Sequence, residues 1–313
     1  MDPLRHLAET QGFFTRATAR DLGYHDKAVS QMMRHRIWHR IRRGYYTYAD
    51  VWAGLTPEGQ HLARAHAVLD SLGDRVALSG VSGLLEHGVA TWNVPLDRVH
   101  VTRLDGAAGR TEGDVVHHEG FCVDSDVVEI DHRRVLAAPR CAIEACSRTS
   151  PESALVSFDS LLHLGICTSG ELEHQFRSMH AWPFTRRLTV PVLMADGRAE
   201  SPGESRGRWL FWSCGLPAPL LQYEVYDADG HLIGVCDWGW PDHGLLGEFD
   251  GRVKYGRLLG PGQLPGEVVF AEKRREDMLR EVTGCSMIRL TWDDYARPRI
   301  THRRVESLLR RAG

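Results

Sequence analysis

The sequence predicts a multidomain protein of mixed α+β or α/β class. Its 313 residues correspond to two or three domains, at about 100–200 residues each. With 42% hydrophobic and 25% charged residues, the composition is that of an ordinary globular protein. The chain contains three regions that differ in the order of their helical and strand-like patterns. We therefore expect three domains, at residues 1–55, 56–195 and 196–313.

The charge balance excludes a protein that coats nucleic acid through bulk charge, because 38 basic residues are offset by 41 acidic residues. Seven cysteines without a CxxC pair indicate neither a disulfide framework nor a zinc knuckle. No apolar run reaches the ~18 residues of a membrane span, and the first residues lack the apolar core of a signal peptide. We expect a soluble, cytoplasmic protein without membrane contact.

Three short helices are predicted at the start of the chain. The first spans Pro3–Thr10 and the second spans Thr15–Leu22, with the Thr15 side chain as the N-cap. The third spans about Asp26–His35, with Asp26 as its expected cap. Its apolar residues recur at helical spacing and leave one polar face, so this helix is expected to pack on one side only.

Residues 37–48 are rich in β-branched and aromatic side chains around Gly44, as expected for a β-ribbon. Three helices followed by a ribbon are the element order of a winged helix-turn-helix domain. In that domain the third helix enters the major groove, and cations neutralise phosphates. The predicted DNA-binding residues here are Lys27, Ser30, Gln31, Arg34, Arg36, Arg40, Arg42 and Arg43. The alternative is a basic, solvated face of a small helical domain.

The middle domain, residues 56–195, combines helical and strand patterns. Helices are expected at residues 61–72, 79–87, 151–164 and 169–179, and short strands at 99–103 and 115–119. Five histidines fall between residues 87 and 132, but none shows HxH, HExxH or i,i+4 spacing. These histidines are therefore interpreted as hydrogen-bonded or solvent-facing residues, and the domain is assigned no role.

The C-terminal domain is expected to begin with a helix from about Ser201 to Gly215. Three strand-like segments follow, and the two joints between them have turn composition, so the strands form an antiparallel meander. The expected strands are residues 221–226, 231–240 and 245–250, with turns at 227–230 and 241–244.

The second turn places acidic residues next to one another. A four-residue turn pairs Trp240 with Leu245 and puts Asp237 directly opposite Glu248. Asp250, two residues further along the strand, points to the same face. Like charges that face each other are destabilising unless a cation lies between them, so this face is a candidate metal site.

The first hairpin, treated in the same way, places Gln222 opposite Val235 on the same face. Hard oxygen ligands favour Mg²⁺ or Mn²⁺ over zinc. Such a metal can polarise a phosphodiester and activate water, and Lys254 can orient that water or neutralise the developing charge. The alternative is an amphipathic sheet with solvent-facing acids.

Two resemblances follow from these residues. The N-terminal domain, together with the segment Ser79–Leu85 (SGVSGLL), resembles the antitoxin-type winged-helix proteins of the AbiEi family over about the first 130 residues. The segment Ser201–Tyr295 resembles the PD-(D/E)XK nuclease superfamily, especially its branch similar to very-short-patch-repair endonucleases. The second resemblance implies a restriction-endonuclease-like fold for the C-terminal domain.

The nuclease resemblance rests on a helix glutamate, a strand aspartate, an E-x-D-G strand end and a later helix. These motifs match Glu204, Asp237, Glu248–Gly251 and Glu272–Arg280. The lysine position of the family's E-x-K motif holds Asp250 here, and Lys254 lies four residues on. The resemblance implies that Glu204, Asp237, Glu248 and Asp250 bind metal, that Glu204, Asp237, Glu248 and Lys254 are catalytic, and that Arg206, Arg275 and Arg280 contact DNA phosphates.

Two functions are compatible with these observations. The first is a DNA-binding endonuclease that depends on Mg²⁺ or Mn²⁺ and serves phage defence or DNA repair. The second is an AbiEi-type antitoxin or transcriptional regulator that keeps a nuclease-like fold only as a scaffold. The expected partners are DNA and either a toxin or a second copy of the chain.

Overall fold

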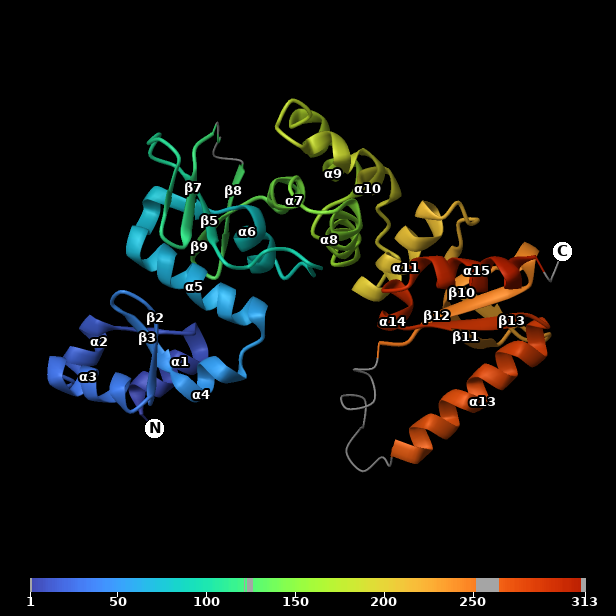
Figure 1. Cartoon of the computed structure of the whole chain (residues 1–313), viewed down its shortest axis with the longest axis horizontal. Coiled ribbons are helices and arrows are strands. Elements are labelled where there is room, and N and C mark those ends of the chain that lie inside the picture. Colours follow the sequence, from blue (N-terminus) through green and yellow to red (C-terminus); the bar gives the residue numbers. More distant parts are fainter. Residues whose placement is uncertain (1, 121, 123–125, 252–264, 311–313) are drawn as a thin grey trace. The chain divides into compact units, whose positions relative to one another are not determined.

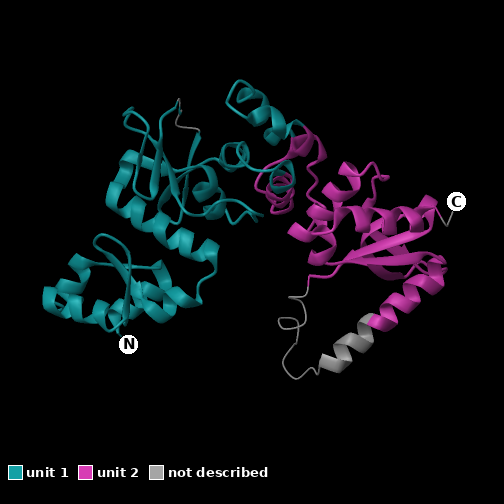
Figure 2. Cartoon of the chain, viewed as in Figure 1, with its two compact units in different colours: residues 1–154, 170–189 teal, residues 155–169, 190–313 magenta. Residues whose placement is uncertain are grey.

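A computed structural model describes residues 2–120, 122, 126–251 and 265–310, and the side chains of residues 265–272 lie outside the description. About 50% of the described residues are helix and 21% are strand, in several sheets, which confirms the mixed α/β multidomain class. The chain divides into two compact units, residues 1–154 with 170–189 and residues 155–169 with 190–313 (Figure 2). The division into three domains stays a prediction.

The first part of unit 1 contains three helices, a small sheet and a fourth helix (Figure 1). The helices are α1 (Pro3–Gln11), α2 (Arg16–Asp21), α3 (Asp26–Arg34) and α4 (Ala49–Gly54), and the strands are β1 (Phe14–Thr15), β2 (Trp38–Arg42) and β3 (Tyr45–Tyr48). The sheet has the antiparallel order β1-β3-β2. Phe14 and Trp38 are buried together with Leu4 and Val29, so one apolar cluster joins the sheet to α1 and α3.

Side chains set the starts of these helices. The Thr15 hydroxyl accepts a hydrogen bond from the Thr18 amide at 3.0 Å, which confirms Thr15 as the N-cap of α2. The prediction that Asp26 caps α3 is wrong. Asp26 is already the first helical residue, and His25 holds the cap position. As an acid in the first turn, Asp26 still interacts favourably with the helix dipole.

The rest of unit 1 is built on a six-stranded sheet with the order β6-β7-β5-β4-β9-β8. Its strands are β4 (Val76–Leu78), β5 (Val99–Arg103), β6 (Arg110–Glu112), β7 (Val115–His118), β8 (Val127–Ile130) and β9 (Arg133–Leu136). The other elements are α5 (Pro57–Leu72), η1 (Gly73–Arg75), α6 (Gly80–Glu86), α7 (Ala138–Cys146), α9 (Ser169–Ser178) and η3 (Thr185–Leu188). The predicted strands at 99–103 and 115–119 are confirmed, whereas the other four were not predicted.

Unit 2 contains a four-stranded sheet with the order β10-β11-β12-β13. Its strands are β10 (Leu220–Tyr226), β11 (Leu232–Trp240), β12 (Leu245–Phe249) and β13 (Ser286–Leu290), and η4 (Pro241–His243) joins β11 to β12. The first three strands are antiparallel, and β12 and β13 are parallel. The helices are α8 (Pro151–His163, mostly in this unit), α10 (Thr189–Met194), α11 (Pro202–Ser213), α13 (Pro265–Thr283), α14 (Trp292–Tyr295) and α15 (Pro298–Leu309).

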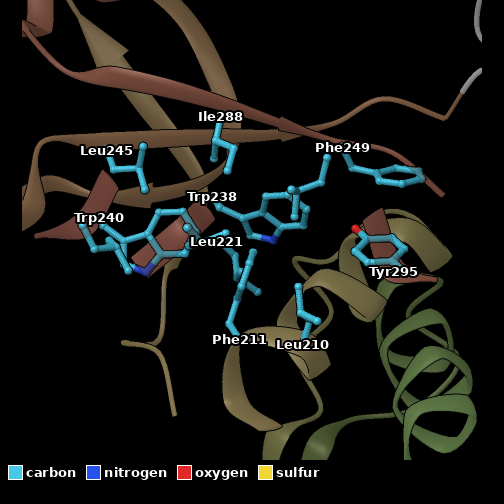
Figure 3. Packing of buried hydrophobic residues seen from close by; sticks show 12 residues of the cluster. Leu210, Phe211, Leu221, Trp238, Trp240, Leu245, Phe249, Ile288 and Tyr295 are labelled. Atoms are coloured by element: carbon cyan, nitrogen blue, oxygen red, sulfur yellow. The ribbon is translucent and has the colours of Figure 1, made fainter. Parts of the chain in front are cut away.

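Helices pack on both faces of this sheet. On one face, Leu210 and Phe211 of α11 and Val305 of α15 join a cluster that contains Trp238 and Trp240 of β11 (Figure 3). On the other face, Leu279 of α13 packs with Leu246, Cys236 and Val225. Because both faces are covered, the strands carry few exposed apolar residues near the sheet centre. None of the helices in the described ranges is long and apolar enough to cross a membrane.

The second hairpin has the predicted register, because Trp240 pairs with Leu245 and Trp238 pairs with Gly247. The first hairpin does not. Val235 pairs with Glu224 instead of Gln222, a shift of two residues. The shift arises at the turn, where the Asp227 carboxylate accepts hydrogen bonds from the amides of Asp229 and His231, at 2.9 and 2.8 Å. These bonds enlarge the turn by one residue, which accounts for half of the register shift. An irregularity between Val225 and Tyr226 adds the second residue of the shift.

Candidate functional site

The predicted DNA-binding side chains of α3 all lie on one exposed face. Val29 is buried, and Met32 and Met33 are half-buried against the apolar cluster of the N-terminal region. The exposed residues on the opposite face are Lys27, Ser30, Gln31 and Arg34. The helix therefore presents two cations and two polar side chains to solvent.

The arginines after α3 extend this surface. Arg36, Arg40 and Arg43 are exposed, whereas Arg42 is half-buried with its guanidinium 5.9 Å from the centre of the Tyr45 ring. Asp26, the acid at the start of α3, pairs with Arg16 at 2.8 Å. Its negative charge is therefore neutralised by Arg16 and does not offset the positive charge of the surface. The hydrogen bond from Arg16 lowers the pKa of Asp26. The net result is a local basic surface on a chain of slightly negative charge.

Glu204, the predicted helix glutamate, lies at the start of α11 and is buried. Its carboxylate accepts hydrogen bonds from the Ser201 hydroxyl at 2.7 Å and the Glu200 amide at 2.9 Å, while the Glu204 amide donates back to the Ser201 hydroxyl. Ser201 is thus the N-cap of α11, and the Glu204 side chain fixes the residues that precede the helix. The Gln222 amide of β10 also donates to Glu204, at 3.1 Å, and thus connects the helix to the sheet.

Glu248, in β12, is also buried and contacts two arginines. Arg275 of α13 bonds to Oε1, and Arg289 of β13 lies 3.1 Å from Oε2. Arg289 is shared with Glu276 of α13, at 3.2 Å. Both oxygens of Glu248 therefore face guanidinium groups, and this ion-pair network attaches α13 to the sheet.

Asp237 lies where β11 and β12 stop pairing. The backbone pairing ends at Trp238 and Gly247, one residue short of the predicted pair between Asp237 and Glu248. The Asp237 carboxylate instead accepts a hydrogen bond from the Phe249 amide at 2.6 Å. Asp250 is half-buried, and its amide donates to the Leu290 carbonyl at 2.7 Å.

The remaining predicted residues of this region lie in different environments. Arg206 is buried, with its guanidinium 4.7 Å from the centre of the Tyr295 ring, so it is not presented at the surface. Arg280 is exposed and pairs with Glu276 at 2.6 Å, while Arg275 is held by Glu248. Lys254 lies outside the described residues.

Three of the four predicted metal ligands accept hydrogen bonds from the protein itself, and metal binding by the four stays a prediction. Glu204 and Glu248 use both of their carboxylate oxygens to accept protein hydrogen bonds, and Asp237 uses Oδ2 in the same way. The guanidinium groups at Glu248 already supply the positive charge that Mg²⁺ or Mn²⁺ would bring. Within the described ranges, three potential ligands converge at Asp227, Asp229 and His231, in the exposed turn between β10 and β11.

A cavity in unit 1 was not anticipated from the sequence. It lies against β5 and β7 and the end of α7, with a volume of about 560 Å³. His100 of β5 and His118 of β7 face each other within it, with 2.9 Å between Nδ1 and Nε2. Eighteen positions separate them, so no local spacing identifies the pair, and only the parallel pairing of β5 with β7 brings them together.

Comparison with known sequences defines the class of the N-terminal region. Residues 2–49 match the family described as transcriptional regulator, AbiEi antitoxin. This match covers α1, α2, α3 and the β2–β3 ribbon, which include all of the predicted DNA-binding residues before position 44. The chain thus carries an antitoxin-type regulator domain at its N-terminus.

Two curated proteins of Mycobacterium tuberculosis resemble the larger part of the chain. The uncharacterized proteins MT2308, of strain CDC 1551/Oshkosh, and Rv2248, of strain H37Rv, are each 30% identical over 253 residues, which are 79% of this chain and 86% of each relative. The chain belongs to the family of these mycobacterial proteins. Among solved structures, the RV2827C protein of Mycobacterium tuberculosis matches with a TM-score of 0.37 and 12% identity, over 71% of this chain and 86% of that chain.

Proposed function

We propose that this protein is a DNA-binding transcriptional regulator or antitoxin of AbiEi type. The observation that carries the proposal is the overlap of the AbiEi match with the exposed basic surface of α3 and the β2–β3 ribbon. The order of three helices and a ribbon supports a winged helix-turn-helix arrangement, in which α3 reads the major groove and the ribbon contacts the backbone. A toxin or a second copy of the chain is the further partner that this class implies.

The electrostatics of the surface support binding to a duplex. Residues 27–43 carry six cationic side chains and no acidic residue. Each phosphate contact adds about 0.9 to the slope of log affinity against log salt concentration. Several contacts therefore give measurable affinity for any duplex, and Gln31, Ser30 and Arg34 provide the polar groups that distinguish base pairs.

A DNA titration tests this proposal. Fluorescence anisotropy across a salt series compares the unchanged protein with the triple variant R40A/R42A/R43A. We expect weaker binding and a slope flatter by about two to three units, since three phosphate contacts are removed. The control variant R110A/R177A/R310A removes three other exposed arginines and should leave affinity and slope unchanged. Equal effects of the two variants would show that only total charge matters.

A metal-dependent nuclease is the second candidate. The order helix, three strands, helix, strand in unit 2, with β12 parallel to β13, supports a PD-(D/E)XK-like core. Glu204, Asp237 and Glu248 lie on neighbouring elements of that core. Both oxygens of Glu204 and Glu248 and one oxygen of Asp237 accept hydrogen bonds from the protein, and this is why we place the regulator first.

Incubation with supercoiled and linear DNA separates the two candidates. The protein is assayed with Mg²⁺, with Mn²⁺ and with EDTA, beside the variant Asp237→Asn. A regulator binds DNA and leaves it intact under all conditions. Cleavage that requires the metal and disappears in Asp237→Asn would establish the nuclease instead.

A further inference from the structure

The cavity of unit 1 has the size and lining of a small-molecule site. Its volume of about 560 Å³ lies within the range of about 300–1,000 Å³ that is usual for ligand pockets. The cavity is lined by strands β5 and β7, here called its floor, by the end of α7 and the residues after it, and by Val94, Pro95, Asp97, Arg98 and Trp182. Every lining residue belongs to unit 1.

The histidine pair on the floor always presents a donor. One of the two imidazoles must donate in the 2.9 Å contact between His100 Nδ1 and His118 Nε2. If His118 donates, the remaining N–H of the pair is at His100 Nε2, and if His100 donates, it is at His118 Nδ1. In either tautomer, one outer ring nitrogen of the pair carries a proton.

A second polar group of the floor is left without a partner. The Thr102 hydroxyl is buried and, within the described part of the chain, has no hydrogen-bond partner. Thr102 lines the same cavity, on the strand that carries His100. A buried hydroxyl without a partner costs about 1–3 kcal/mol, and a ligand that accepts its hydrogen bond would remove that cost.

Within the described residues, one arginine of the cavity lining is left without an acidic partner and can attract an anion. The acids of the lining are engaged. Glu144 accepts bonds from Arg140 and the Gly80 amide, Glu119 accepts a bond from the Gly109 amide, and Asp97 pairs with Arg98 at 3.6 Å. Arg148, in contrast, has no carboxylate partner in the described part of the chain, and its guanidinium lies 5.3 Å from the centre of the Phe184 ring.

A metal cation is disfavoured at the histidine pair for the same reason. Burial lowers the pKa of both imidazoles, and Arg148 lowers the pKa of His118 further. The Arg148 guanidinium, which is close enough to act on the His118 ring, would repel a cation bound there and attract an anion.

We propose that this cavity binds a small organic phosphate, with the phosphate group held by Arg148, the His100–His118 pair and the Thr102 hydroxyl. A tetrahedral phosphate offers three acceptor oxygens to donors that come from the strand floor and from beyond α7, whereas a planar carboxylate offers two. The volume exceeds that of phosphate alone, and Trp182 in the lining provides an aromatic surface for the organic part. The inference concerns unit 1 beyond its DNA-binding region and does not depend on the proposed function.

Thermal melting of the full chain at constant ionic strength tests the site. The probes are inorganic phosphate, adenosine 5′-monophosphate, adenosine and citrate, added to the unchanged protein and to the variants Arg148→Gln and Thr102→Val. We expect inorganic phosphate and the mononucleotide to raise the Tm, with no effect of adenosine. Arg148→Gln should weaken the apparent affinity for the mononucleotide by at least about tenfold, as the loss of a charged hydrogen bond predicts.

The matched control is Arg177→Ala, which removes an exposed arginine of the same unit. A phosphate response that is equal in Arg148→Gln and the unchanged protein would overturn the proposal, as would the absence of any response to inorganic phosphate. A rise in Tm with citrate alone would show that the cavity binds a carboxylate and not a phosphate, and would also overturn the proposal. Circular dichroism and DNA titration of each variant check that folding and the N-terminal surface are unaffected.

Discussion

The carboxylate of Asp237 bonds to the backbone amide of Phe249, with 2.6 Å between Oδ2 and N. Backbone pairing of β11 with β12 ends just before these residues, at Trp238 and Gly247. The side chain therefore continues the link between the two strands beyond the point where their backbones separate. Phe249 is buried, so its amide has no access to water as an alternative partner.

Replacement of Asp237 tests this structural role. Asp237→Ala should destabilise unit 2 by about 1–3 kcal/mol, because it leaves a buried N–H without an acceptor. Asp237→Asn keeps a side-chain oxygen and should cost less. Hydrogen-exchange mass spectrometry of peptides from β11 and β12 under increasing urea measures the loss of stability in each variant. Equal losses in the two variants would contradict the structural role of the Asp237 side-chain oxygen.

Glu248 and Arg275 form the ion pair that attaches α13 to the sheet. Arg275→Met should lower the stability of this attachment by about 1–2 kcal/mol. The loss is smaller than for a fully buried pair, since Arg275 is 37% exposed and Arg289 continues to neutralise Glu248. Exchange rates of α13 amides provide the measurement, with Arg274→Met, an exposed neighbour, as the control. Unchanged exchange rates in Arg275→Met would show that contacts other than the Glu248–Arg275 ion pair hold α13 to the sheet.

Gly207 in α11 is required for close packing. A Cβ at this position would lie 2.3 Å from Cζ2 of the Trp238 ring. Gly207→Ala should therefore destabilise unit 2 by about 1–3 kcal/mol, despite the gain of about 1 kcal/mol in helix propensity. Gly54→Ala is the matched control, because nothing lies within 4 Å of its Cβ, and it should be neutral or stabilising. Urea unfolding of both variants checks this, and a stable Gly207→Ala protein would show that the Trp238 ring can move.

Acid should destabilise unit 1 through two of its histidines, His100 and His61. Burial, aided by His118, lowers the pKa of His100 from 6.5 to about 4, and burial also lowers the pKa of His61. Between pH 6.5 and 4 the unfolded chain binds protons that the folded chain does not, so stability is full above pH 6.5 and decreases below it. His100→Gln should flatten this dependence in melting curves across that range. Parallel curves for the variant and the unchanged protein would mean that His100 titrates normally.

Gln31 and Arg43 should differ in how they contribute to DNA binding. Gln31 is exposed on α3, where we expect its side-chain amide to bond to a base edge, whereas the exposed Arg43 directly follows β2, where we expect it to contact a phosphate. Gln31→Ala should reduce the preference for a selected site over scrambled DNA by about 1–3 kcal/mol. Arg43→Ala should weaken both sequences alike and lower the salt slope by about 0.9. Identical behaviour of the two variants would indicate that α3 does not read bases.

The accuracy of the sequence-based predictions in unit 2 depended on the turns. The turn at residues 241–244 contains Pro241 and ends at Gly244, which has φ of +52°, so its length and the register of β11 with β12 could be predicted. The turn after Tyr226 could not, because the Asp227 side chain rearranges it through hydrogen bonds to two amides. A side chain that competes for backbone donors changes a loop length that composition alone leaves open.

The sequence by itself determined the local features of the protein: the apolar and polar faces of α3, the N-cap at Thr15 and the basic character of residues 27–43. These depend on neighbours within a few positions, so spacing and residue type suffice. Only the tertiary structure decided the partners of charged and polar groups distant in the chain. Glu248 is paired with Arg275 across 27 positions, and His100 meets His118 across 18. Such pairs follow from strand order and helix packing, because electrostatic and hydrogen-bond energies depend on distance in space and not along the chain.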